Sequence, residues 1–174
     1  MSKLYVNEVH SKTGSTKALE INSSGNLIVP QKIAFMAKLT TNFNPSTSSR
    51  TKIPFATNNS AARVFNYGDG FKDGNNWFEA PIDGLYFFMA SAYVASHSDS
   101  NYHILRFTLN NNATAVGEGY SIAVPHAAAY QSQHIHCYVN MTAGDTLDCR
   151  TQSSGDSSYN IEFSNSHFSG HFIG

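Results

Sequence analysis

The stretch GLYFFMASAYVA, residues 84–95, contains no charged residue and no polar alternation. A strand with one face in water alternates apolar and polar side chains. Here Leu85, Tyr86, Phe87, Phe88 and Met89 follow one another and leave no polar face. A strand at this place therefore needs apolar cover on both of its sides, which constrains what the chain can fold into.

The composition favours strands over helices. The chain has 174 residues, of which 41% are hydrophobic, so it has room for one domain with a sizeable core. Only 13% are charged, about half the usual share. The surface must therefore be built largely from Ser, Thr, Asn and Gly, which suits strands and turns.

Clusters of turn residues divide residues 32–174 into short segments. We expect strands near 33–41, 51–56, 62–67, 76–80, 84–96, 102–110, 114–124, 130–142, 146–151 and 159–173. This pattern predicts an all-β antiparallel sandwich or jelly roll. A short helix over 87–96 is an alternative by propensity, although the aromatic residues there favour a sheet.

Residues 1–31 form a separate segment, with the larger domain at 32–174. As a strand, LYVNEV places Leu4, Val6 and Glu8 on one side and Tyr5, Asn7 and Val9 on the other. ALEINSSGNLIVP predicts a hairpin with a Gly-containing loop. Because this segment is too small to bury a core alone, it needs a partner surface. We expect its apolar residues to dock on that partner: Leu4, Val6, Leu19, Ile21, Leu27 and Val29.

The strand at 84–96 packs one face into the sandwich, and its other face needs equally apolar cover. Another copy of the chain is the economical cover, which predicts an obligate oligomer. A long loop that covers this face is the alternative. The residues assigned to the interface or the core strand are Leu85, Tyr86, Phe87, Phe88, Met89 and Tyr138.

QHIHCYV predicts a strand on which His134, His136 and Tyr138 share one face. In an oligomer these imidazoles are candidates for a transition-metal site or a pH switch. The simpler interpretation is polar histidines that form hydrogen bonds or meet water. Aspartates also gather in turns, but no dense carboxylate loop indicates calcium. We therefore expect no cofactor.

Cys137 and Cys149 flank a turn centred on residues 143–145, which places them on neighbouring strands about one pair out of register. We expect two buried thiols, although a one-step change of register would favour a disulfide.

Charge and motifs exclude several classes of function. The net charge is −1 and no basic stripe is visible, which disfavours a nucleic-acid partner. No apolar run approaches the roughly 18 residues of a membrane span, and the N-terminus lacks a signal-peptide core. Gly-x-Ser-x-Gly, His-Glu-x-x-His and phosphate-cradling loops are absent, so we expect no enzyme.

Four short motifs follow one another along the larger domain: Ala34-Phe35; Phe78, Pro81, Gly84, Tyr86 and Phe88; Ala143-Gly144-Asp145; and Phe168-Ser169-Gly170. In this order and spacing they resemble C1q-like domains, relatives of the tumour-necrosis-factor jelly roll. The resemblance covers residues 33–174 and implies a ten-strand jelly roll assembled as a homotrimer. His171 departs from the family pattern, which has an apolar residue directly after the Gly.

The first segment resembles N-terminal segments of bacteriophage structural and fibre proteins, especially those of cyanophages. It implies a virion protein made in the host cytoplasm: the trimeric knob of a fibre or spike, or a capsid decoration (head fibre). Its partners would be its own copies, other virion proteins through residues 1–31, and a host surface glycan or protein. A bacterial secreted or cell-surface ligand-binding module is the alternative.

Overall fold

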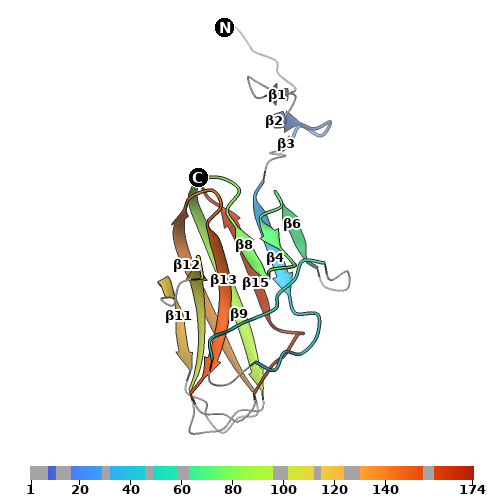
Figure 1. The fold of residues 1–174 in the computed structure, drawn as a ribbon. Coiled ribbons are helices and arrows are strands. Elements are labelled where there is room, and N and C mark those ends of the chain that lie inside the picture. Colours follow the sequence, from blue (N-terminus) through green and yellow to red (C-terminus); the bar gives the residue numbers. More distant parts are fainter. Residues whose placement is uncertain are drawn as a thin grey trace, which may run out of the picture. The chain divides into compact units, whose positions relative to one another are not determined.

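The computed structural model describes residues 8–10, 17–28, 32–45, 49–58, 63–95, 102–111, 115–123, 130–154 and 159–174. The regular elements among these residues are all strands, and no helix that could cross a membrane occurs within these ranges. The chain divides into two compact units, residues 1–32 and residues 33–174 (Figure 1).

The first unit is a three-stranded antiparallel sheet in the order β1-β2-β3. Its strands are β1 (Glu8–His10), β2 (Lys17–Ile21) and β3 (Leu27–Ile28). The Asn22 Oδ1 atom accepts hydrogen bonds from the backbone N–H groups of Ser24 and Asn26, and Gly25 adopts a φ of 79°. These residues close the turn between β2 and β3, so the hairpin expected here is confirmed.

The second unit is a sandwich of two antiparallel sheets. One sheet has the order β11-β10-β13-β8-β7, with β5 beside β13. Its strands are β5 (Thr51–Lys52), β7 (Phe71–Lys72), β8 (Trp77–Glu79), β10 (His103–Leu109), β11 (Ala115–Ala123) and β13 (Thr146–Ser153).

The other sheet has the order β12-β9-β15-β4-β6, with β14 beside β9. Its strands are β4 (Ala34–Lys38), β6 (Phe65–Tyr67), β9 (Gly84–Ala95), β12 (Tyr130–Met141), β14 (Asn160–Ile161) and β15 (His167–Phe172). The all-β antiparallel sandwich is confirmed, and β9 excludes the helical alternative for residues 87–96. The stretch 159–173 is not one strand, because a turn at 163–165 divides it into β14 and β15.

Aromatic rings fill the space between the two sheets. The Phe35 ring lies 4.9 Å from that of Phe71, 5.3 Å from that of Phe78 and 4.8 Å from that of Phe168, measured between centroids. The stacked and edge-on contacts join strands of both sheets, so burial of these rings holds the layers together.

The connection at 142–145 corrects one expectation. β12 pairs with β9 along its whole length, from Tyr130 opposite Ala95 to Met141 opposite Gly84, and β13 pairs in the other sheet. Residues 142–145 therefore turn the chain from one layer to the other and do not close a paired hairpin. The apolar sides of β12 and β13 face each other across the core, which buries both strands more fully than a two-strand ribbon would.

Candidate functional site

β9 has two apolar faces, and the sandwich covers only one of them. Tyr86 and Phe88 point into the core and are fully buried. Leu85 and Met89 point the other way and stay 37% and 38% exposed, with Phe87 between them half-buried. No segment that the structure describes covers this second side as the loop alternative required. Within the described part of the chain this apolar side therefore stays partly exposed.

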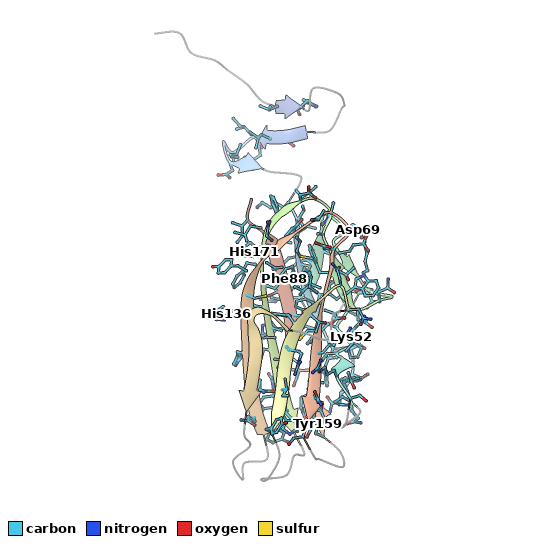
Figure 2. The ribbon with its side chains drawn as sticks, turned by 60° about the vertical axis from the view of Figure 1, so that its left-hand side comes forward. Lys52, Asp69, Phe88, His136, Tyr159 and His171 are labelled. Atoms are coloured by element: carbon cyan, nitrogen blue, oxygen red, sulfur yellow. The ribbon has the colours of Figure 1, made fainter. Side chains whose placement is uncertain are left out.

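The neighbouring strands extend this side into a continuous surface, here called the outer face. It consists of the outward side chains of the second sheet: Met36 and Lys38 of β4; Leu85, Phe87, Met89, Ser91 and Tyr93 of β9; Ser132, His134, His136 and Tyr138 of β12; and His167, Ser169 and His171 of β15. Figure 2 shows His136 and His171 on the outside of the sandwich and Phe88 within it.

Strand register places the outer face in cross-strand rows. Tyr138, Phe87 and His171 form one row. The next row runs through His136, Met89 and Ser169. The third row runs through His134, Ser91 and His167 and continues to Lys38. Residues from distant parts of the chain thus meet on one surface.

An aromatic cluster occupies the first two rows. The Phe87 ring centroid lies 5.1 Å from that of Tyr138, 5.5 Å from that of His171 and 6.3 Å from that of His136. Tyr138 is 63% exposed although its ring is apolar. Tyrosine combines an apolar ring with a polar hydroxyl group and is enriched at protein interfaces. The cluster is therefore suited to contact another protein.

The third row carries the charge of the outer face. Burial lowers the pKa of His167, and the nearby Lys38 ammonium and the His134 imidazole lower it further, because a second positive charge is unfavourable there. The Nε2 atom of His134 lies 3.1 Å from the Ser132 hydroxyl oxygen. The neutral imidazole is therefore the form of His167 that this row favours.

The structure separates the residues that the sequence grouped as interface or core strand. Leu85, Phe87, Met89 and Tyr138 lie on the outer face, whereas Tyr86 and Phe88 lie in the core. The Tyr86 hydroxyl donates to the Ile82 carbonyl oxygen at 2.7 Å. His167 and His171 were missed by the sequence reasoning, because only register brings them beside β9.

The candidate metal ligands His134 and His136 share the outer face with Tyr138, as the alternation predicted. Among the described residues, no three His, Cys, Asp or Glu side chains lie together in a group that could hold a metal ion. Two of the turn aspartates bind the chain itself: Asp73 accepts from the Thr57 backbone and hydroxyl, and Asp83 accepts from the Ala143 N–H.

The predicted docking residues of the first unit divide into two groups. Leu19, Ile21 and Leu27 are exposed. Val9, which was not assigned to docking, pairs with Leu19 and is also exposed, so it extends the same apolar side. The remaining three lie outside the described residues: Leu4, Val6 and Val29.

The two cysteines contribute no disulfide. Cys137 of β12 and Cys149 of β13 are buried free thiols that enter the core from opposite sheets. The expectation that they lie on neighbouring strands is wrong, whereas the expectation of two buried thiols is confirmed. Burial raises the pKa of Cys137 to about 12 and raises that of Cys149 well above its ordinary value, so neither is a reactive thiolate.

A buried polar cluster on the first sheet was also missed. The Asp148 carboxylate accepts hydrogen bonds from Thr108 and from the Arg150 guanidinium, whose Nε and Nη2 atoms lie 2.7 Å and 2.8 Å from its oxygens. The Lys52 ammonium lies 3.5 Å away. These partners pair the carboxylate fully, so the cluster acts as a structural anchor.

Comparison with known proteins identifies related folds. The family model "C1q domain" matches residues 34–173. The solved structure "Globular Domain of Zebrafish Complement 1qA protein" is 15% identical, with a TM-score of 0.57, and the match covers 82% of this chain and 98% of that one. Eiger TNF from S. frugiperda is 12% identical with a TM-score of 0.55, covering 83% and 94%. These identities show a shared fold. A search of curated proteins finds no match.

Proposed function

The chain belongs to the C1q-domain family, and from that premise we propose that it forms a homotrimer that serves as a non-enzymatic binding or structural module. Domains of this family generally form homotrimers. The single observation that carries the proposal is the outer face, an aromatic and apolar surface that the described residues of one copy leave open to water.

A second copy is the cover that fits this surface best. Leu85, Met89 and Tyr138 lie on the flat outside of a sheet, where apolar atoms are costly to hydrate. Neighbouring imidazole and hydroxyl groups supply polar partners at the same surface. An interface that buries the outer face in every copy removes the apolar exposure from all of them at once.

Within this class we propose a role in a bacteriophage virion, as the knob of a fibre or spike or as a capsid decoration. The resemblance of residues 1–31 to phage structural proteins supports this role. The exposed side chains of Leu19, Ile21 and Leu27 support docking of that segment on another virion protein. Three copies would also raise weak contacts with a host surface to useful avidity. A bacterial secreted or cell-surface binding module is the second candidate.

Light scattering tests the trimer. We expect a mass three times the 19.0 kDa of one chain at pH 8. Tyr138→Asp places a charge on the outer face and should give the single-chain mass. Tyr102→Asp is the matched control, because Tyr102 is an exposed tyrosine beside β10 in the other sheet, and it should stay trimeric. A wild-type mass of 19.0 kDa would refute the proposal.

Immunogold labelling of purified phage particles with an antibody against this chain tests the virion role. Label at fibre ends supports an attachment knob, and label over the head supports a decoration protein. Particles without label, together with recovery of the chain from the culture medium of living bacteria, would favour the secreted module.

A further inference from the structure

Four histidines of each chain share the outer face. His134 and His136 come from β12, and His167 and His171 come from β15 on the far side of β9. They occupy three adjacent cross-strand rows, and His134 is close enough to lower the pKa of His167. Histidine is the side chain whose ordinary pKa, about 6.5, lets it change charge near neutral pH.

The strands that carry these histidines offer them no carboxylate. β4, β6, β9, β12, β14 and β15 contain no aspartate or glutamate, and Lys38 adds a permanent positive charge opposite His167. Two glutamates lie in neighbouring segments: Glu162 follows β14, and its backbone N–H donates to the Tyr93 carbonyl oxygen, whereas Glu118 belongs to β11, a strand that contacts β12. The same strands also carry tyrosines, of which Tyr67, Tyr93, Tyr130 and Tyr138 are at least partly exposed.

We propose that assembly through the outer face is gated by pH: copies associate while the four histidines are neutral and separate when acid protonates them. This inference rests on the proposed homotrimer. Protonated imidazoles would place several positive charges from each copy, together with Lys38, in one water-poor interface. The two glutamates named above lie outside the strands of this sheet, so they do not neutralise the added positive charges. These charges therefore repel one another.

The direction of the pH effect depends on whether the histidines bind protons more weakly in the assembly or in the free chain. An imidazole buried in the interface has a lower pKa than the same imidazole in a free chain, so the free chains bind more protons. The stability of the assembly is therefore complete above pH about 6.5 and falls as the pH drops below that value. The half-burial of His167 in a single copy already lowers its pKa in this direction.

The test is light scattering of the full chain at pH 8 and at pH about 5.5, one unit below the ordinary histidine pKa. We expect a trimer at pH 8 and the single-chain mass of 19.0 kDa at pH 5.5, with recovery on return to pH 8. Circular dichroism at both pH values checks that the sandwich stays folded. At pH 5.5 we expect at least about a fivefold rise in the trimer dissociation constant, which is the effect of a single histidine per assembly whose pKa is one unit lower in the trimer than in the free chain.

Glutamine variants separate the histidines from other groups. The variant H134Q/H136Q/H167Q/H171Q should remain trimeric at both pH values, and the pair variant H134Q/H136Q should shift the transition to lower pH. H10Q is the matched control, because His10 is an exposed histidine in the first unit, and it should behave as wild type. E118Q and E162Q should each keep the transition.

The outcomes distinguish this inference from the proposed function. A single-chain mass at pH 8 refutes the homotrimer and the pH gate with it. A trimer at pH 8 that persists unchanged at pH 5.5 refutes the pH gate alone. The inference is overturned if H134Q/H136Q dissociates at the same pH as the wild type. It is also overturned if E118Q or E162Q loses the transition, because either result would assign the pH effect to other groups.

Discussion

The Phe88 ring occupies the space in which a side chain at position 170 would lie. A Cβ atom added to Gly170 would be 2.5 Å from Phe88 Cδ1 and 2.9 Å from the Phe35 ring. Both rings belong to the buried aromatic cluster, so they have little room to move aside. The glycine of the last strand is therefore a packing requirement.

Gly170→Ala should lower the free energy of unfolding by about 1–3 kcal/mol, the usual cost of overpacking a core. Urea denaturation followed by tryptophan fluorescence of Trp77 measures it. Gly74→Ala is the control, because nothing lies within 4 Å of a Cβ at that position and its φ is not positive. The control should change stability by no more than about 1 kcal/mol, and an equal loss in both variants would contradict the packing argument.

Asp148→Asn should destabilise the second unit by about 2–3 kcal/mol, because it removes the charge that pairs with Arg150 and Lys52 at a buried site. Asp69→Asn is the control, since the Asp69–Lys72 pair is exposed and its loss should cost less than about 0.5 kcal/mol. Thermal unfolding of both variants measures the difference. Similar melting temperatures for the two would show that the Asp148 cluster contributes no special stability.

Neither cysteine should react with a thiol reagent while the protein is folded. Burial raises the pKa of both thiols, so almost no thiolate is present at pH 8, and the core excludes the reagent. Absorbance with dithionitrobenzoate should show full labelling in guanidinium chloride and slow labelling at the rate of unfolding without it. Rapid labelling of the native protein would contradict this burial.

Removal of residues 1–32 should leave the sandwich folded, because every residue of its buried cluster lies in residues 33–174. Circular dichroism should show a melting temperature within a few degrees of that of the full chain. Light scattering of the same sample should report the same number of copies. An insoluble or unfolded product would show that the first unit contributes to the fold of the second.

The fold class could be predicted from the chain because its signals are local. The positive φ values at Asn110, Asn111 and Gly144 fall in the Asn- and Gly-containing turns that the sequence marks. The partner of β12 could not be predicted in the same way. A tight turn between two alternating strands is compatible both with a hairpin and with a crossing between the two layers. Only the pairing of β12 along the whole of β9 shows that the chain crosses between the layers.

The candidate site was predicted in part for a similar reason. Alternation in QHIHCYV placed His134, His136 and Tyr138 on one face, because apolar residues separate them. β9 is an uninterrupted apolar run without such alternation, so its sequence does not mark which side chains face the core. Tyr86 and Phe88 could therefore not be distinguished from Leu85 and Met89. His171 joins Phe87 through pairing between strands that are far apart in the sequence, which local patterns do not record.

The start of β4 also has a mechanical consequence. Any tension transmitted along the chain from residues 1–32 enters the sandwich at Ile33, whose carbonyl accepts a hydrogen bond from the Phe172 N–H at 3.0 Å. The next residues are held between β15 and β6, so several ladder hydrogen bonds share the load before the strand can detach. A pull on the N-terminal segment is thus distributed into the same sheet that bears the outer face.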